Sequence, residues 1–495
     1  MADLIVTAAL VFCLLAASTH LVTVALALYR VSRPRNRMSE RSVEPVSIVR
    51  PVCGVDHFDE MTLRSTFELD ATDYEIIFCA ARDDDAAVPL VRKLMAEYPH
   101  IEARLLIGDD RPTSNPKLNN IVKGWAAARH DWIVLADNNV LMPSRYLEDL
   151  FRSFGAGVGL VCSPPVGSHP VGFWAELECA FLNTYQARWQ IAADTIGFGF
   201  AQGKSMLWRR DILDDAGGIE ALGAEIAEDA AATKIVRANG LDVRLVDRPF
   251  EQPLGPRSIA QVWDRQVRWA RLRRATFPIF YAPEILSGCS LPAMAAMIAA
   301  AGFDVDPLMA LLFYIGVWFG AEALLARVAG WQMRLHSPLV WMLRDALLPV
   351  LWVEGWAGNT FVWRGNDMSV AKGEDEAAIS SASARTVASR SAARTSCETR
   401  PMASASAERK RRPVKRSSLA RAAGTAARMG RTQRALYPMP SFAAGIAYWL
   451  ASSAMRMSQQ SARPRPPPRQ NPWIIAIVGF GQPIRALKAA SFKAS

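Results

Sequence analysis

The stretch from residue 42 to residue 275 constrains the fold most, because short β-rich runs alternate there with helix-sized segments. Strands separated by helices form βαβ units, whose strands lie parallel in one sheet. Such a sheet binds its ligands at the carboxyl ends of its strands. The sequence therefore predicts an α/β domain with a Rossmann-like, mostly parallel sheet. Its expected strands are residues 46–49, 74–79, 103–107, 132–136, 159–163 and 242–246.

An uncharged segment precedes this domain. Residues 4–29 contain no charged side chain and are long enough to cross a bilayer, whereas a signal peptide has a shorter apolar core. We therefore expect residues 1–30 to be a retained transmembrane anchor. By the positive-inside rule, the arginines behind it place the following domain on the cytoplasmic side of the inner (plasma) membrane. These are Arg30, Arg33, Arg35, Arg37 and Arg41.

Three further apolar segments follow the α/β domain, at residues 285–303, 308–326 and 338–358. They predict two or three membrane-embedded helices within residues 285–360, and hence a multi-pass protein. Charged residues interrupt the second and third segments, so these charges either face the interior of a helix bundle or mark helices that lie in the membrane interface. They are Glu322, Arg344, Asp345 and Glu354.

The positive charge is confined to the end of the chain. Of 57 Lys and Arg and 47 Asp and Glu, 21 and 2 lie in residues 381–495, so the first 380 residues carry 36 bases and 45 acids. This acidic body argues against general nucleic-acid binding. Residues 374–495 lack a sustained apolar face, which predicts a disordered basic tail. Because residues 381–495 contain no aspartate, we hypothesise a shifted reading frame there; resequencing the locus tests this.

Acidic residues fall where a parallel sheet binds ligands. Residues 82–85 (RDDD) follow one expected strand, Asp137 directly follows another, and Glu228 and Asp229 open an expected helix. Carboxylates in such places can hold Mg²⁺ or Mn²⁺ or accept hydrogen bonds from a sugar. Each has a structural alternative, since RDDD suits a solvated turn and Asp229 suits the positive end of a helix dipole. Asp137 has the fewest such alternatives.

Two further segments could contact an anionic ligand. Lys117 and Asn119 lie in SNPKLNN, where the lysine can meet a diphosphate and the asparagine a ribose or base, although a plain helix start explains both equally well. Small residues in 197–211 allow close backbone approach to a ligand before a further strand.

Five arginines crowd residues 265–274, RQVRWARLRR. This segment has three interpretations: a nucleic-acid patch, a solvated helix face, or a binding site for an anion inside an active site. Helical spacing places Arg265 and Arg268 on one side of this helix, which favours the anion-binding interpretation. The remaining arginines are expected to form an interfacial anchor for anionic headgroups. They are Arg271, Arg273 and Arg274.

Taken in order, these pieces resemble the ceramide glucosyltransferase family, family 21 of the glycosyltransferases, in a bacterial-looking form. The resemblance covers about residues 1–300 and is carried by RPVCGVD, STFELDATDYEIIFCAARDDD, ARLLIGDD, NPKLNN, LADNNV, GLVCSPPV, IAEDAAATK and RQVRW. It implies an inverting, membrane-bound enzyme of the GT-A fold. A nucleotide sugar would be its donor and a membrane lipid its acceptor.

The resemblance also implies roles for single residues. Asp85, with Asp84 beside it, would contact the uracil or ribose of the donor, and Asp137 with Asn139 would hold the metal and diphosphate. Asp229 would be the general base, with Glu228 beside it at the substrate. The (Q/R)xxRW element would be Arg265, Arg268 and Trp269.

Three departures from the family pattern bear on the site. Asn139 occupies the third position of a D-x-D-like element, where an aspartate would supply a metal ligand. The family pattern therefore gives weaker support for metal dependence in this chain. The histidine of animal members has no counterpart among Tyr185, Gln186 and Arg188, and the family cysteine is replaced near Ala201. Acceptor contacts are therefore the least transferable part.

The implied reaction is transfer of glucose from UDP-glucose to the primary hydroxyl of ceramide. Two alternatives stay open. A related enzyme could use a hopanoid, sterol or diacylglycerol acceptor, or another UDP-sugar. More distantly, the chain could be a non-enzymatic membrane protein that binds anionic lipid or nucleic acid through the KRRPVKR segment of its tail.

Overall fold

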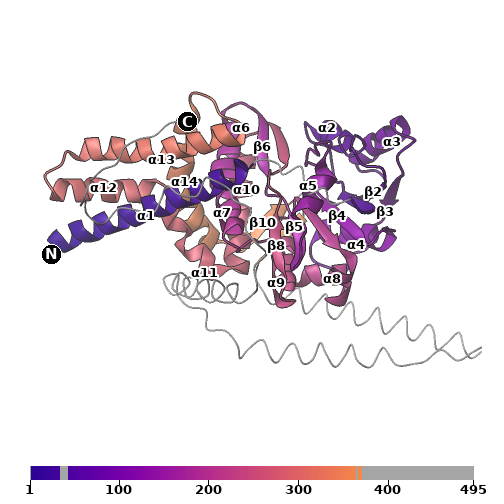
Figure 1. The fold of residues 1–495 in the computed structure, drawn as a ribbon. Coiled ribbons are helices and arrows are strands. Elements are labelled where there is room, and N and C mark those ends of the chain that lie inside the picture. Colours follow the sequence, from indigo (N-terminus) through magenta and orange to yellow (C-terminus); the bar gives the residue numbers. More distant parts are fainter. Residues whose placement is uncertain (1, 34–42, 364–365, 371–495) are drawn as a thin grey trace, which may run out of the picture. The chain divides into compact units, whose positions relative to one another are not determined.

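The computed structural model describes residues 2–33, 43–363 and 366–370 (Figure 1). The predicted basic tail, with the hypothesis of a shifted reading frame, lies outside these residues. So do Arg35, Arg37 and Arg41. All described residues belong to one compact unit.

A seven-stranded sheet forms the centre of the α/β part, in the order β3-β2-β1-β4-β7-β5-β8. All six expected strands are present. The neighbouring strands run parallel, except that β7 is antiparallel to both β4 and β5. The predicted α/β, mostly parallel, GT-A-like sheet is thus confirmed, with one reversed strand. Its strands are β1 (Val46–Pro51), β2 (Tyr74–Ala80), β3 (Ala103–Ile107), β4 (Trp132–Ala136), β5 (Val158–Cys162), β7 (Ser205–Arg209) and β8 (Asp242–Leu245).

Helices cover both faces of this sheet, because alternate strand residues point to opposite sides and both sets are apolar. Ile48 and Ile76 pack in one cluster with side chains of α2, α3 and α5, whereas Val49 and Ile77 pack in another with side chains of α4, α8 and α9. These helices are α2 (Asp59–Arg64), α3 (Ala87–Glu97), α4 (Pro116–Ala127), α5 (Tyr146–Ser153), α8 (Arg210–Asp215) and α9 (Glu228–Ala238).

A second group of elements joins the sheet to the apolar helices. Strands β6 and β9 pair in parallel, and α6 continues through a π-helical segment into α7. Helix α10 starts at a capping box, in which Ser258 and Gln261 satisfy each other's backbone N–H groups. The bounds are β6 (Val166–Val171), α6 (Phe173–Ala180), η1 (Phe181–Ala187), α7 (Arg188–Thr195), η2 (Ile219–Ala224), β9 (Glu251–Pro256) and α10 (Ile259–Thr276).

Within the residues that the structure describes, two helices are long and apolar enough to cross a membrane, α1 (Ala2–Val31) and α13 (Pro307–Ala329). A third span is possible by length and composition if Pro278–Leu286 and α12 (Ser290–Gly302), which meet at 46°, count as one bent segment. Helix α1 packs against α12 and α13 (Figure 1). The remaining elements are α11 (Pro278–Tyr281), η3 (Ala282–Leu286), α14 (Ser337–Ala357), β10 (Thr360–Trp363) and β11 (Asn366–Ser369).

The charges in these apolar segments mostly point inward. Arg344 forms ion pairs with Glu322, at 3.0 Å, and with Asp345, at 2.7 Å, and all three side chains are buried. Glu354 is instead only half-buried and lies 3.5 Å from Arg271. Of the two alternatives for these charges, the bundle interior is therefore correct for the first three.

The anchor helix is also tied to the α/β part. Arg30, at the end of α1, is buried and forms ion pairs with Asp194, at 2.9 Å, and Asp247, at 2.8 Å. Its guanidinium also donates to the carbonyl of Leu245, at the end of β8. The first of the positive-inside arginines thus has a structural function in joining helix to sheet.

Candidate active site

The centre of the site is Lys117, whose ammonium joins three segments distant in sequence. Its Nζ lies 2.6 Å from Asp137 Oδ1, 2.5 Å from Glu228 Oε1 and 2.8 Å from the carbonyl oxygen of Gly203. Lys117 lies in the first turn of α4, whose N-cap Asn115 accepts from Lys117 N and Leu118 N. Asp137 follows β4, Gly203 precedes β7, and Glu228 begins α9.

Asp137 receives a second lysine on its other oxygen. Lys204 Nζ lies 2.8 Å from Asp137 Oδ2 and 3.2 Å from Asn139 Oδ1. Burial by itself would raise the pKa of Asp137, but the two ammonium groups outweigh it and hold that pKa well below its ordinary range. Asp137 is therefore an ionised carboxylate held between two cations.

Asp229 differs from Asp137 in the direction in which its surroundings shift the pKa of the carboxyl group. Burial and the neighbouring Glu228 raise the pKa of Asp229 to about 6, against the opposing effect of Lys117. Its Oδ2 accepts from Gly203 N at 3.2 Å, and its Oδ1 accepts from Ala230 N at 2.8 Å. A partly buried carboxylate with this pKa is mostly ionised at neutral pH and can still take up a proton, which is what a general base requires.

Gly203 is a site residue that our sequence prediction did not single out. A Cβ at this position would lie 2.7 Å from Glu228 Oε1 and 3.3 Å from Lys117 Nζ, closer than these groups could stay. Lys204 and Asn115 were likewise not predicted, and Asn115 Nδ2 donates to Glu228 Oε2 at 2.9 Å. Two features of the sequence pointed towards them: the run of small residues before β7 and the turn before α4.

The other predicted donor-binding residues lie outside this cluster. Asp85 Oδ1 accepts from Gly54 N at 2.8 Å and Ala87 N at 2.9 Å, so it joins the segments that follow β1 and β2. Asp84 is exposed and pairs with Arg82 at 2.5 Å. Asn119 Oδ1 accepts from the backbone N and the hydroxyl of Thr113, which orders the turn before α4.

Helix α10, which contains the five arginines of residues 265–274, approaches the site through Arg265. This side chain forms an ion pair with Glu178, which is fully buried in α6. Its charge is also close enough to Lys204 to oppose protonation there. Arg268 instead lies over the ring of Trp363, at 5.9 Å, and Trp269 packs on a cluster of Cys179, Leu182 and Leu254.

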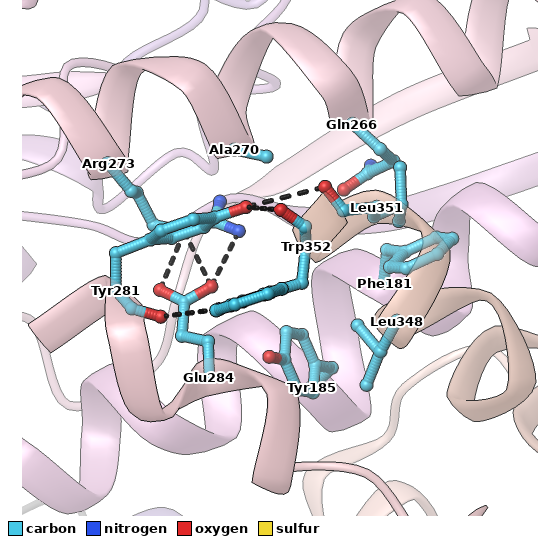
Figure 2. A pocket seen from close by; sticks show the side chains of 10 residues that line it. All are labelled: Phe181, Tyr185, Gln266, Ala270, Arg273, Tyr281, Glu284, Leu348, Leu351 and Trp352. Carbon is cyan, nitrogen blue, oxygen red and sulfur yellow. Dashed lines mark hydrogen bonds and ion pairs between the residues drawn. The ribbon is translucent and has the colours of Figure 1, made fainter. Parts of the chain in front are cut away.

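The later arginines of α10 bond within the protein. Arg273 forms a 2.9 Å ion pair with Glu284 beside a small cavity, where Tyr281 donates to the carbonyl of Trp352 at 3.1 Å (Figure 2). Arg274 donates to Asn359, and Arg271 to the carbonyl of Thr360. These side chains therefore fasten α10 to η3 and to the segment that follows α14, and their expected contact with anionic headgroups stays a prediction. The cavity is lined by Phe181, Tyr185, Gln266, Ala270, Arg273, Tyr281, Glu284, Leu348, Leu351 and Trp352.

The pair expected to hold Mg²⁺ or Mn²⁺ does not fit a divalent cation in this arrangement. Both oxygens of Asp137 and the amide oxygen of Asn139 already accept from lysine ammonium groups. A divalent ion on Asp137 Oδ2 would lie roughly 4 Å from Lys204 Nζ, where repulsion is about 8 kcal/mol at an effective dielectric constant of 20. Within the described residues, no three His, Cys, Asp or Glu side chains are grouped to hold a metal.

The chain is similar in sequence to known ceramide glucosyltransferases. Ceramide glucosyltransferase 3 of Caenorhabditis elegans is 27% identical over 373 residues, which are 73% of this chain and 80% of that protein. Ceramide glucosyltransferase of Komagataella phaffii is 30% identical over 290 residues, 47% of this chain and 57% of that protein.

Among solved structures, mannosyltransferase PcManGT from Pyrobaculum calidifontis, in complex with GDP-Man and Mn²⁺, matches with a TM-score of 0.43 and 15% identity. That match covers 72% of this chain and 98% of the other. The sequence profile described as Glycosyl transferase family 21 matches residues 10–376, well over half of the chain. The protein is thus a glycosyltransferase that belongs to family 21 and is related to ceramide glucosyltransferases.

Proposed function

We propose that this protein transfers glucose from UDP-glucose to the primary hydroxyl of ceramide, at the cytoplasmic face of the membrane. The observation that carries the proposal is Asp229, a carboxylate with a pKa of about 6 that lies beside the Lys117 and Asp137 cluster. Relatives of the chain that are named ceramide glucosyltransferases support the donor and acceptor.

In the proposed reaction, the acceptor hydroxyl oxygen attacks C1 of glucose while Asp229 takes up the hydroxyl proton. The bond between C1 and the β-phosphate oxygen breaks in the same displacement, and its electron pair leaves with UDP. The new linkage is β because the attack inverts C1. A base whose pKa lies close to the working pH combines a sufficient ionised fraction with a sufficient affinity for the proton.

The donor would lie across the carboxyl ends of the central strands. Asp85 holds the segments after β1 and β2 together, and we place the nucleoside there. The diphosphate would then lie nearer to Asp137, Lys204 and Arg265. Lys117 would act by holding Asp137 and Glu228 in place, since all three of its N–H groups already have protein acceptors.

The apolar helices would serve the acceptor. A two-tailed lipid could keep its chains in the bilayer beside α1 and α13, while its head reaches the site. Exposed apolar side chains on these helices support contact with lipid, among them Leu14 and Phe313, which are 56% and 74% exposed.

The test is to express the chain in a host without glycolipids, supply ceramide, and identify the product by mass spectrometry with linkage analysis. We expect a β-linked hexosylceramide that is absent with Asp229→Asn and present with Asp215→Asn, an exposed aspartate on α8. Active Asp229→Asn protein would remove this residue from the base role. Product formation only with a sterol, hopanoid or diacylglycerol, or only with another UDP-sugar, would replace the proposed substrates.

A further inference from the structure

Lys204 has the geometry of a cation placed for a further anionic ligand. An ammonium group carries three N–H donors. Two of them are directed to Asp137 Oδ2, at 2.8 Å, and Asn139 Oδ1, at 3.2 Å. Among the residues that the structure describes, no third acceptor lies within hydrogen-bond distance of this ammonium. One donor is therefore left for a ligand, on a side chain that is 18% exposed.

Lys117 differs in this respect, although the two lysines share Asp137. Its three donors are already used by Asp137, Glu228 and the Gly203 carbonyl. Of the two ammonium groups, only that of Lys204 can add a hydrogen bond without losing one.

The charges around Lys204 also favour an anion. Burial lowers the pKa of Lys204, and repulsion from Lys117 and Arg265 lowers it further, against the opposing attraction of Asp137. Arg265 has its own carboxylate partner in Glu178. A negative group between Lys204 and Arg265 would be attracted by both cations and would relieve their mutual repulsion.

We propose that the Lys204 ammonium takes the position of the divalent cation at the donor diphosphate, so that this enzyme binds nucleoside diphosphate and transfers sugar without a metal ion. The inference rests on the proposed function for its donor. As the bond between C1 and the β-phosphate oxygen breaks, the electron pair stays on that oxygen. Lys204 donates a hydrogen bond to the diphosphate and keeps its proton, while the acceptor proton goes to Asp229.

Asn139 belongs to the same arrangement. A neutral amide oxygen accepts a hydrogen bond from Lys204 without adding negative charge, so the ammonium stays the net positive group facing the donor. An aspartate at this position would offer a second carboxylate for a divalent ion.

The first experiment measures UDP binding by calorimetry, using the purified full-length chain in detergent with excess EDTA, Mg²⁺ or Mn²⁺. We expect the same affinity and the same transfer rate under all three conditions. Lys204→Met should weaken UDP binding about tenfold or more, the range for one charged hydrogen bond. Lys204→Arg should keep most of the binding, which separates loss of charge from misfolding. Lys93→Met, an exposed lysine paired with Glu60, is the matched control and should bind UDP like the unmodified chain.

The outcomes separate this inference from the proposed function. UDP binding and transfer that disappear in EDTA and return with Mn²⁺ would overturn metal independence and leave the transferase function standing. Loss of binding in Lys204→Arg as large as in Lys204→Met, with both proteins folded, would also overturn it. Failure to bind UDP or to transfer sugar under every metal condition would overturn both proposals.

A second experiment converts the site. The double variant Lys204→Met with Asn139→Asp removes the ammonium and adds a carboxylate beside Asp137, which provides oxygen ligands suited to Mn²⁺. Electron paramagnetic resonance should detect Mn²⁺ bound to this variant and not to the unmodified chain, and its UDP binding should become dependent on Mn²⁺. Equal Mn²⁺ affinity in the two proteins would contradict the inference.

Discussion

Replacing Asp229 by Asn should abolish transfer and at the same time stabilise the protein at neutral pH. The pKa of Asp229 is about 6 in the folded chain, compared with an ordinary value of 3.8. This upward shift means that folding disfavours the ionised carboxylate. At 1.36 kcal/mol for each pH unit, the ionised form costs at most about 3 kcal/mol of folding free energy.

The sign of the pH dependence follows from these two values. Above pH 6 the carboxylate is ionised in both the folded and the unfolded chain, and the full cost applies. As the pH falls below 6, the folded state binds the proton first and regains stability, and below 3.8 both states are protonated and the cost disappears. Asn, which resembles the protonated acid, should therefore be more stable than Asp at pH 8, by up to about 3 kcal/mol, and by less than about 1 kcal/mol near pH 4.

Thermal unfolding in detergent between pH 4 and pH 8 measures this difference, with Asp215→Asn as the exposed control. In parallel, the kcat/KM of the unmodified enzyme should fall about tenfold for each pH unit below 6, because only the ionised base accepts the proton. An Asp229→Asn protein that transfers sugar, or one that is less stable than Asp229 at pH 8, would refute the reasoning.

Four further results are expected. Glu228→Gln removes the negative neighbour that raises the pKa of Asp229, so the acid limb of the rate profile should move to lower pH; an unchanged limb would contradict this. Gly203→Ala places a methyl group 2.7 Å from Glu228 Oε1, and the displaced carboxylate should lower kcat about 10- to 100-fold in transfer assays, whereas full activity would show that the close approach is not needed. Arg344→Met leaves Glu322 and Asp345 buried without their cation, which should destabilise the protein by about 3–5 kcal/mol; an unchanged melting temperature would argue against the ion pairs. Truncation after residue 376, where the family match ends, should leave the transfer rate unchanged, and a large loss would give the tail a function in the reaction.

The family resemblance identified residues more reliably than it identified their contacts. It pointed to Asp137 and Asp229, and both lie in the central cluster. It also grouped Arg268 and Trp269 with Arg265, although Arg268 lies over Trp363 and Trp269 packs in an apolar cluster. Spacing on a helix defines which residues share a side, but the partner of each side depends on what the rest of the chain places there.

The sequence by itself determined the strands of the sheet, the two apolar spans and the acidic residues that follow or open particular elements, because these depend on local periodicity and composition. Only the tertiary structure decided that β7 runs against its neighbours and so brings Lys204 onto Asp137, 67 residues away along the chain. The tertiary structure also decided that one lysine has all its donors used while the other has one left. Ion pairs between distant segments depend on the register and direction of the strands that carry them, and a single sequence contains no local signal for either.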